Sequence, residues 1–512
     1  MAEIKYTAIT IGPIFETMMN VTKPAGLWGA SYLFSVISKE LCYRIEEVYP
    51  GKIITPYFEF DDLSTKMQKT GIGFYHDHIV VKGADITIIN SFIKEEKQSI
   101  AKRIYSSLKT IDPLYQEKEV VSYVCRYLQI YGVELYVPEK ENVLLYVNRY
   151  LDSIELRKQY IPAETENYIC SFLENEIIKN SFLTDGLVNW QLTGRYGRIK
   201  ALPDIAESDS KEKTEEVDSE KEVYKRYSYF ALVQSDADRM GKIISEFKTE
   251  AEMKEFSTQC LKYAASACKL IRTYGGVVIY AGGDDLQFIA PLTHGDDNLF
   301  GLIRSIVRVF DEIFIKGTKF EGAENRPTLS FGAEIVYEKY PLYEALNESY
   351  SLLSLAKEGG RDAIRIRLLK HSGQTAEFAI NRLSESIKTN GKQKVFKDLE
   401  AMINKSLDGQ MLHSVITHIS EFSGFLDFAV KQFKETGNSH AVENFFINSF
   451  DNTGQEKWKD ALSMVQKTVL HADAIKVDDI IVKKTGHSEM ITGVTSALRL
   501  VNFFNEKGVD DE

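Results

Sequence analysis

The chain has 512 residues, a formal net charge of −12 and five cysteines. This length accommodates about two to four domains, and because apolar runs are short and the start of the chain lacks signal-peptide character, we expect a cytoplasmic protein. The acidic balance argues against a chain that wraps nucleic acid by itself, and the scattered cysteines, which form no Cys-x-x-Cys pair, argue against a zinc ribbon or a disulfide framework.

The first predicted domain spans residues 1–90 and has the element order β-α-β-β. Residues 6–11 form a β-rich run, and residues 26–37 carry apolar side chains at helical spacing. Residues 53–60 and 74–81 are the next two predicted strands.

The tripeptide His76-Asp77-His78 lies within the third predicted strand. One interpretation is the metal site of a phosphohydrolase, which would require further His and Asp residues at helical spacing. The other histidines are spread along the chain, so we favour polar positions on a partly exposed strand.

Three further segments have simpler patterns. Residues 91–200 show helical periodicity with a β-like run at 142–147, which predicts a mainly helical insert. Residues 201–225 are charged and aperiodic, as is typical of a linker. Residues 373–512 carry apolar side chains at three-to-four spacing, which predicts a helical C-terminal domain.

Residues 226–372 form the second predicted α/β domain. A β-rich run ends at Asp236, a helix follows, then a hairpin, a second helix and a fourth strand over residues 328–336. This is the β-α-β-β-α-β order of ferredoxin-like domains. We therefore predict an α+β fold.

A hairpin is predicted at the tetrapeptide Gly282-Gly283-Asp284-Asp285. Residues 277–281 and 286–290 are apolar and rich in β-formers, and they flank this turn. Glycine adopts positive φ at little cost and lets a ligand approach the backbone. An ordinary surface turn is the alternative for the tetrapeptide alone, since Gly and Asp are common turn residues.

Three carboxylates are expected to meet at one point. If the strand that ends at Asp236 neighbours the hairpin, Asp236 lies close to Asp284 and Asp285. Such a cluster repels itself unless a divalent cation occupies it, and oxygen-only ligands suit Mg²⁺ or Mn²⁺. The pattern therefore predicts a metal site at this edge of the sheet.

The motifs of both α/β units resemble the large subunit of type III CRISPR effector complexes, most closely its Cmr branch. In the second unit the resemblance is carried by residues 231–242, by the Tyr280-Ala-Gly-Gly-Asp-Asp285 hairpin and by residues 340–346 and 355–361. Residues 24–34 resemble the first, degenerate palm of that subunit. The resemblance implies two ferredoxin-like palm domains, a helical insert and a helical C-terminal domain.

The resemblance also implies an activity and a set of site residues. That family joins ATP molecules into cyclic oligoadenylate messengers once its complex binds foreign RNA. By that resemblance, Asp236, Asp284 and Asp285 are the catalytic and metal-binding residues of a two-metal site, with ATP as substrate. Residues expected to contact nucleotides are Gly282, Gly283, Lys357, Trp28 and Ser31.

Core packing is the alternative for Trp28, because tryptophan is usually buried, and a solvated position at a helix end is the alternative for Lys357. The expected partners are the other subunits of the complex, with guide and target RNA bound mainly through them, and no membrane.

The chain departs from the family pattern in three respects. Many family members begin with a histidine-aspartate nuclease domain, whereas this sequence starts directly at the first palm. We therefore expect no cleavage of single-stranded DNA by this subunit. The four-cysteine zinc site that many members carry is also missing. In the first palm, Asp61 and Asp62 lie near the end of the second predicted strand without glycines beside them, which favours one catalytic palm and one binding palm.

Three alternatives remain open from sequence. The same palm chemistry could conjugate AMP to a small molecule such as S-adenosylmethionine, since it requires only a nucleophile in line with the α-phosphate. The chain could instead be a catalytically silent scaffold, although the three aspartates argue against it. A stand-alone dinucleotide cyclase is less favoured, because such enzymes normally act as palm homodimers whereas this chain supplies two palms.

Overall fold

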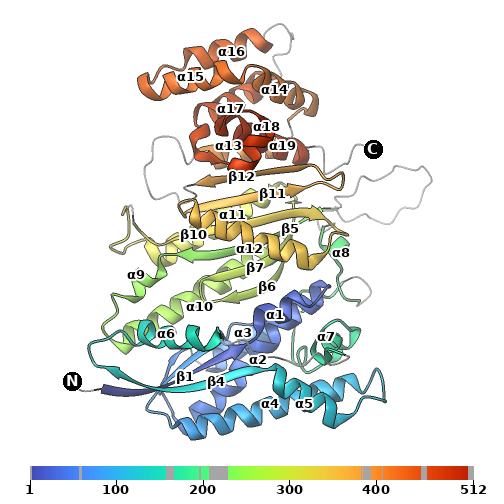
Figure 1. Ribbon diagram of the computed structural model, residues 1–512, viewed down its shortest axis with the longest axis vertical. Coiled ribbons are helices and arrows are strands. Elements are labelled where there is room, and N and C mark those ends of the chain that lie inside the picture. The colour runs from blue at the N-terminus through green and yellow to red at the C-terminus, as the bar shows by residue number, and fades with distance from the viewer. Residues whose placement is uncertain are drawn as a thin grey trace.

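Two β-sheets and a cap of helices follow one another along the long axis of the computed structural model (Figure 1). The structure describes residues 3–56, 60–156, 166–188, 190–194, 198–206, 229–323, 325–381, 383, 394–405, 407–450 and 458–505. The mixture of helices and largely antiparallel sheets confirms the predicted α+β fold.

The first sheet has four strands in the order β2-β3-β1-β4. Every neighbouring pair is antiparallel, which together with the chain order gives a complete ferredoxin-like unit. The strands are β1 (Glu3–Gly12), β2 (Ile53–Thr55), β3 (His78–Lys82) and β4 (Gln129–Pro138).

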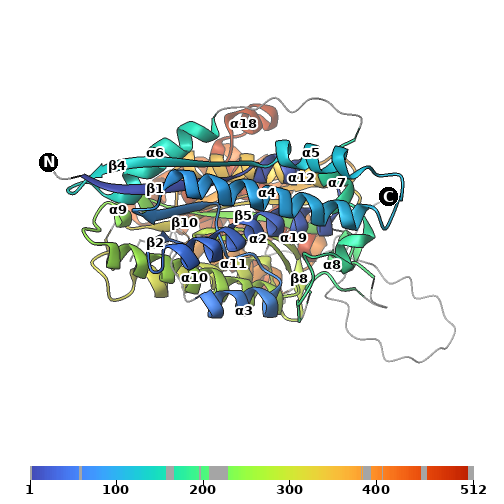
Figure 2. The same ribbon diagram turned by 90° about the horizontal axis from the view of Figure 1, so that it is seen from below.

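Helices α2 and α4 pack against each other on the face of this sheet that carries Ile9 and Ile79, whereas the opposite face, with Ala8 and Val80, packs on α6 (Val143–Glu155). Helix α2 is buried along most of its length because it contacts β1 and also, in the second sheet, β6 (Val277–Gly282). Helix α4 runs along the outer side, as the view from below shows (Figure 2), and its N-cap Asp85 accepts a hydrogen bond from the Thr87 amide at 2.7 Å. These helices are α1 (Ile14–Met19), α2 (Pro24–Val48), α3 (Phe60–Thr70), α4 (Ile86–Leu108) and α5 (Glu117–Tyr127).

Strand β4 corrects the predicted boundary of the first domain. It pairs with β1 over ten residue pairs, so the first palm extends beyond residue 90 into the segment predicted as a helical insert. The β-like run at 142–147 is instead the start of helix α6 (Val143–Glu155), where Asn142 accepts a hydrogen bond from the Leu145 amide at 3.1 Å. A short apolar run does not by itself distinguish strand from helix, and the N-cap decides here.

The second sheet has seven strands in the order β13-β12-β11-β10-β5-β7-β6. Its last four members, β10-β5-β7-β6, repeat the ferredoxin-like order, with helices α10 and α11 as the crossovers. The elements are β5 (Tyr229–Asp238), α9 (Met240–Ile244), α10 (Glu250–Thr273), β6 (Val277–Gly282), β7 (Asp285–Pro291), α11 (Leu299–Phe310), the π-helix η3 (Asp311–Ile315) and β10 (Thr328–Tyr337).

Helix α12 (Leu342–Glu358) connects β10 to the parallel strand β11 (Ala363–Leu369) and packs on β10 and β5. Strands β12 (Thr375–Asn381) and β13 (Ile475–Lys476) extend the same sheet. The predicted boundary at residues 372 and 373 therefore falls between paired strands, and the C-terminal domain shares the sheet of the second palm.

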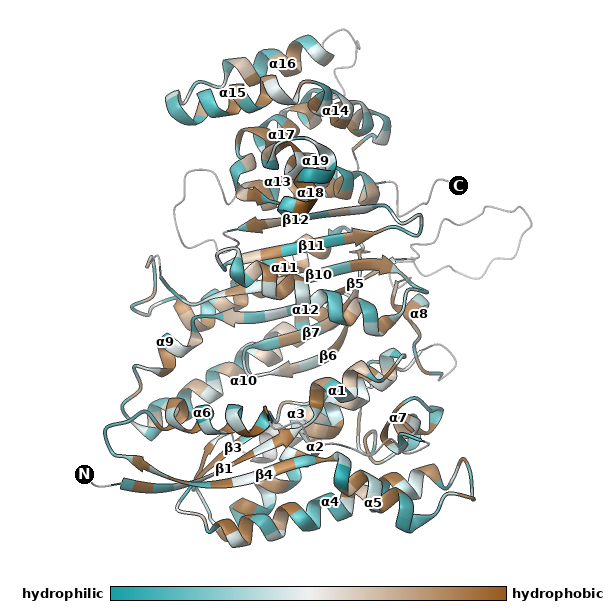
Figure 3. Ribbon diagram, viewed as in Figure 1, coloured by the Kyte–Doolittle hydropathy of each residue, from teal (hydrophilic) through white to brown (hydrophobic). Residues whose placement is uncertain are grey.

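The remaining C-terminal residues form the predicted helical cap. Its outer helices carry teal and brown residues along their length (Figure 3), as expected for helices with one face on a core. They are α13 (Lys394–Asn404), α14 (Gly409–Glu421), α15 (Ser423–Thr436), α16 (His440–Phe450), α17 (Lys459–Leu470), the 3₁₀ helix η6 (Ala472–Ala474), α18 (Asp479–Thr485) and α19 (Glu489–Asn505).

Short elements join the two palms. They are α7 (Tyr168–Leu173), the 3₁₀ helix η1 (Glu176–Asn180) and α8 (Leu202–Ala206), with the small hairpin of β8 (Thr293–His294) and β9 (Asp297–Asn298) inside the second unit. Residues 207–225 of the predicted linker lie outside the described residues. Among the described helices, none combines the length and apolarity that crossing a membrane would require.

Polar contacts fix the two palms relative to each other. Glu250 at the start of α10 accepts a hydrogen bond from the Tyr6 hydroxyl at 3.0 Å and pairs with Lys82 at 2.7 Å. Gln191 exchanges two hydrogen bonds with the backbone of Val278 in β6. The space between the palms therefore has defined walls.

Candidate active site

The tetrapeptide Gly282-Gly283-Asp284-Asp285 closes the hairpin of β6 and β7, as predicted. Gly282 pairs with Asp285, which leaves Gly283 and Asp284 as a two-residue turn. Gly283 has φ +65 and open space around its backbone, and a side chain on Gly282 would collide with the Tyr280 ring. Both glycines are therefore required, one by conformation and one by space.

The three predicted carboxylates meet. Asp236 in β5, Asp284 in the turn and Asp285 at the start of β7 each offer an oxygen, and these atoms all lie within 4.8 Å of one another. β5 and β7 are hydrogen-bonded neighbours, which brings the end of one strand beside the start of the other. The predicted convergence of Asp236 and Asp284 is confirmed.

Lys357, on the last turn of α12, contacts the carboxylate of Asp236. Lys357 is one of the residues that the resemblance predicts to contact nucleotides, and its amine lies beside the carboxylate cluster. Both side chains remain partly exposed, at 27% and 33%, so the pair can exchange partners when an anion or a cation enters the cluster.

Burial and mutual repulsion raise the pKa values of the hairpin carboxylates. Burial, followed by the charge of Asp236, raises the pKa of Asp284 to about 6, against a smaller opposing effect of Lys357. Burial and the charges of Asp284 and Asp236 also raise the pKa of Asp285 well above its usual range. A cluster whose charged form is this costly, and whose ligand atoms are all oxygen, fits a divalent cation of the Mg²⁺ or Mn²⁺ type.

Asp238 has a different role from Asp236, although the two lie on the same strand. It is 1% exposed, and its carboxylate accepts hydrogen bonds from Thr328 at 2.8 Å, from Ser330 at 2.9 Å and from the Asp362 amide at 3.0 Å. These contacts hold the end of β5 to β10 and to the loop that follows α12. Asp238 therefore supports the position of Asp236 without contributing an oxygen to the cluster.

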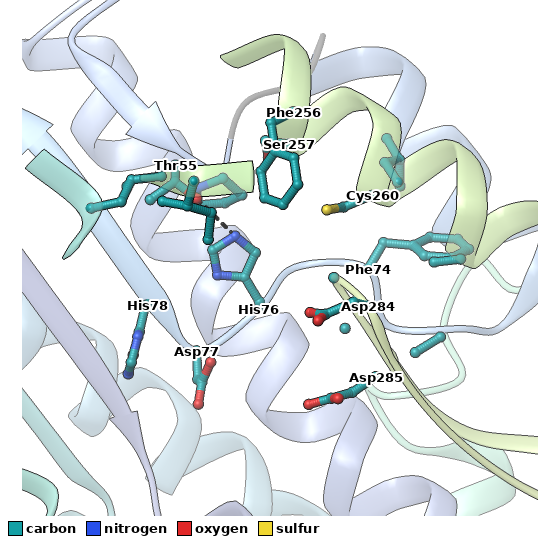
Figure 4. A pocket seen from close by; sticks show the side chains of 18 of the residues that line it. Thr55, Phe74, His76, Asp77, His78, Phe256, Ser257, Cys260, Asp284 and Asp285 are labelled. Atoms are coloured by element: carbon teal, nitrogen blue, oxygen red, sulfur yellow. Dashed lines mark hydrogen bonds between the residues drawn. The ribbon is translucent and has the colours of Figure 1, made fainter. Parts of the chain in front are cut away.

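The cluster opens into a cavity of about 260 Å³ between the two palms. The Gly282–Asp285 turn forms one wall, and Thr55, His76, Asp77 and His78 of the first palm form the opposite wall (Figure 4). Helix α10 closes a third side with largely apolar residues: Met253, Phe256, Ser257, Cys260, Leu261 and Ala264.

The first-palm wall corrects our interpretation of the His76-Asp77-His78 tripeptide. Strand β3 begins only at His78, and the three residues face the cavity instead of occupying an exposed strand. His76 contacts the Thr55 hydroxyl at 3.0 Å, and burial lowers its pKa to about 4, so its imidazole is neutral at physiological pH. The position of these residues at the cavity depends on how the two palms pack, and no local sequence pattern predicts it.

A second group of potential ligands includes two residues of this wall, Asp77 and His78. Asp77, His78 and Glu155 each offer an atom within 4.8 Å of the others. His78 contacts Glu155 at 2.7 Å, and Glu155 also accepts a hydrogen bond from Thr10. Burial acts to lower the pKa of His78, but Glu155 and Asp77 outweigh it and raise the pKa above its usual value.

Two of the residues predicted to contact nucleotides lie elsewhere. Trp28 is 1% exposed, donates its indole N–H to the Gly71 carbonyl at 2.7 Å and stacks on Tyr32. Ser31 is buried in the same helix. Both belong to the core of α2 and are absent from the cavity wall, which corrects that prediction: their helix is buried by both sheets, so its faces serve packing.

Comparisons with known proteins agree with this architecture. Residues 229–365 match the family described as Cas10/Cmr2, second palm domain. The chain is 30% identical over 232 residues to the CRISPR system Cmr subunit Cmr2 of Pyrococcus furiosus, and the aligned part covers 39% of this chain and 26% of that protein. The aligned part therefore spans about a quarter of the length of that curated relative.

Solved structures extend the similarity of fold over nearly the whole chain. A chain of the type III-B Cmr-β complex in the apo state superposes with a TM-score of 0.56 at 12% identity, covering 98% of this chain and 82% of its own length. A chain of the Csm1–Csm4 cassette in complex with cA4 gives 0.51 at 12% identity, covering 99% and 70%. The similarity of fold thus includes both palms and the helical cap.

Proposed function

We propose that this chain, a Cmr-type Cas10 large subunit, is the nucleotidyltransferase of a type III CRISPR antiviral complex and converts ATP into a cyclic oligoadenylate second messenger after target RNA binds. The observation that carries this proposal is the meeting of Asp236, Asp284 and Asp285 on a glycine hairpin at a cavity between two palms. That a chain of this fold has been solved in complex with cA4 is consistent with the product class.

The residues of the cluster have distinct tasks in this reaction. Asp236, Asp284 and Asp285 would hold Mg²⁺ or Mn²⁺, and a pair of such ions stabilises charge on the attacking oxygen and on the departing pyrophosphate. Gly283 has no side chain and open space around it, so the triphosphate of ATP can approach the backbone of the turn. Lys357 would turn from Asp236 toward the phosphate oxygens, where a cation lowers the cost of the developing charge.

The opposite wall would hold the attacking group. Neutral His76 and the Thr55 hydroxyl face the cavity from the first palm. The apolar face of α10, with Phe256 and Cys260, limits water at the reaction centre. The two palms thus have unequal tasks, since one supplies carboxylates and the other positions the acceptor.

RNA recognition would come mainly through partner subunits of the complex. The chain is acidic overall, with a net charge of −12, whereas proteins that bind nucleic acid alone usually carry a basic face. We therefore expect guide and target RNA to regulate the site across subunit contacts.

A second candidate function is conjugation of AMP to a small cationic acceptor such as S-adenosylmethionine. The specific observation that favours it is that Asp77 lines the acceptor wall and that Glu155, which contacts His78, has an oxygen within 4.8 Å of the Asp77 carboxylate. Carboxylates at that place would attract a positively charged acceptor and repel the triphosphate of a second ATP.

The test uses the assembled complex with ATP, Mn²⁺ and target RNA, with and without S-adenosylmethionine. Pyrophosphate release and product mass are measured for wild type and for Asp284→Ala with Asp285→Ala. The matched control is Asp296→Ala with Asp297→Ala, in the exposed hairpin turn of β8 and β9.

We expect release by wild type and by the control, and none by the Asp284/Asp285 variant, with assembly intact in all three. A product that contains the methionyl group would select the second candidate. Wild type that assembles, binds target RNA and releases no pyrophosphate would favour the scaffold alternative.

A further inference from the structure

A polar row runs across the second sheet directly behind the carboxylate cluster. Gln234 of β5 pairs with Gln287 of β7, and Gln287 pairs on its other side with Tyr280 of β6. Side chains two residues apart on a strand share a face of the sheet. Asp285 and Gln287 therefore face the same side, as do Asp236 and Gln234 on the neighbouring strand.

Gln287 is buried in a way that leaves its amide without a partner. It is 1% exposed, and within the described part of the chain neither its Oε1 nor its Nε2 has a hydrogen-bond partner. Gln234, across the ladder, donates to the Ser349 hydroxyl at 3.1 Å. A buried amide without partners costs free energy, so its retention requires an explanation.

Asp285 is the neighbour of Gln287 on that face, and within the ranges that the structure describes it offers an unpaired acceptor where Gln287 offers an unpaired donor. Oδ1 of Asp285 is also buried and has no partner among the described residues. An amide N–H and a carboxylate oxygen, two residues apart on one strand face and both unpaired, need only a side-chain rotation to approach each other.

We propose that Gln287 is the positioning residue of Asp285. When a divalent cation and a triphosphate draw the ionised Asp285 into its binding orientation, Nε2 of Gln287 donates a hydrogen bond to Oδ1. This bond fixes the orientation of the carboxylate and leaves Oδ2 for the cation. The inference rests on the proposed function, because it assigns Gln287 a role in the same site.

The test separates a role in the site from a role in folding. In Gln287→Leu a buried amide without partners is replaced by an apolar side chain of similar size, so the melting temperature should be unchanged or higher. Gln234→Leu is the matched comparison on the facing strand, and it should lower the melting temperature because it breaks the bond to Ser349.

Two readouts are measured on the full chain in its complex. One is the Mn²⁺ concentration that gives half of the cation-dependent thermal stabilisation, and the other is pyrophosphate release. For Gln287→Leu we expect the Mn²⁺ midpoint to rise and the rate to fall, each by about ten-fold, which is typical of the loss of an outer-shell partner. Gln287→Met is also apolar but has a more flexible side chain. If both variants show the same changes, the changes do not come from poor packing of the leucine.

The inference is overturned if both Gln287 variants keep the wild-type Mn²⁺ midpoint and rate, or if the melting temperature and the rate fall while the midpoint stays unchanged. The Mn²⁺ readout does not depend on turnover. If wild type binds Mn²⁺ but releases no pyrophosphate, the proposed function fails, while the shift of the midpoint still tests the role of Gln287.

Discussion

Two hairpins of the chain have the same Gly-Asp-Asp turn sequence, and one of the two lies in a cluster of carboxylates. Gly283-Asp284-Asp285 joins β6 to β7, and Gly295-Asp296-Asp297 joins β8 to β9. The glycines have φ +65 and +60, and in each hairpin the second aspartate pairs with the residue before the glycine. The local sequence and the backbone of the two turns are thus nearly the same.

Their surroundings differ. Asp296 and Asp297 are exposed, whereas Asp284 and Asp285 face a cavity and lie beside Asp236 and Lys357. A Gly-Asp-Asp turn alone therefore makes no carboxylate cluster, and what distinguishes the first hairpin is the third carboxylate, the lysine and the first palm across the cavity. Each prediction below alters one of these differences, from the largest expected effect to the smallest.

Removing the third carboxylate should make the first hairpin resemble the second. We expect Asp236→Ala to reduce pyrophosphate release by at least about 1,000-fold and to abolish stabilisation by Mn²⁺, because the remaining carboxylates no longer enclose a cation. Both are measured on the assembled complex by pyrophosphate assay and by thermal denaturation with Mn²⁺. If the variant keeps both properties, Asp284 and Asp285 are sufficient for Mn²⁺ binding and for pyrophosphate release.

Removing the lysine should have a smaller effect. Lys357→Met keeps the length of the side chain but loses the charge beside Asp236, and we expect the rate to fall by about 10- to 100-fold with a raised KM for ATP. Lys339→Met, at an exposed position before α12, is the control. An unchanged KM and rate for Lys357→Met would show that Lys357 is a solvated residue at a helix end with no role in binding ATP.

The site should respond to pH, and the sign depends on whether the cation is present. Because the pKa of Asp284 is raised to about 6, the folded state binds its proton more tightly than the unfolded state does. Without a cation, the stability contributed by this group therefore falls as pH rises from about 4 to about 6. With Mn²⁺, which requires the ionised form, the stabilisation should appear only as pH rises through about 6.

Asp284→Asn tests this account directly. We expect it to stabilise the cation-free protein by on the order of 1 kcal/mol at pH 8 and to have little effect below pH 4. Asp296→Asn, in the exposed hairpin, should change stability by less at either pH. Thermal denaturation in a chelating buffer measures both, and a destabilising Asp284→Asn at pH 8 would contradict the account.

The smallest effect compares the two glycines. Gly283→Ala and Gly295→Ala each force a residue with a side chain into positive φ, and each should cost about 1 kcal/mol of stability. Only Gly283→Ala should also raise the KM for ATP, since only that turn lies at the cavity. Equal effects of the two variants on the KM for ATP would show that the triphosphate does not bind at the Gly283 turn.

The comparison also shows how far the sequence could predict this site. The hairpin, the strand that carries Asp236 and the second ferredoxin-like order follow from alternation, turn chemistry and spacing within one segment of the chain. Lys357 is predicted only through the resemblance to the family, because a single lysine near the end of a helix carries no local signal of a site.

The rest depends on contacts that no local pattern encodes. His76 and Asp77 reach the cavity because the two palms pack on each other, and Trp28 is buried because both sheets cover its helix. Strand β4 was missed because few of its residues are buried, so its apolar alternation is weak. The unpaired amide of Gln287 also becomes visible only when the ladder partners on both sides are known.

The most direct test is a structure of the complex with Mn²⁺ and a non-hydrolysable ATP analogue. The account predicts anomalous density for Mn²⁺ within coordination distance of Asp236 and Asp284, with the triphosphate along the Gly283 turn and the opposite palm facing its α-phosphate. A nucleotide bound outside the cavity, or Mn²⁺ absent from the three aspartates in a complex that binds target RNA, would contradict it.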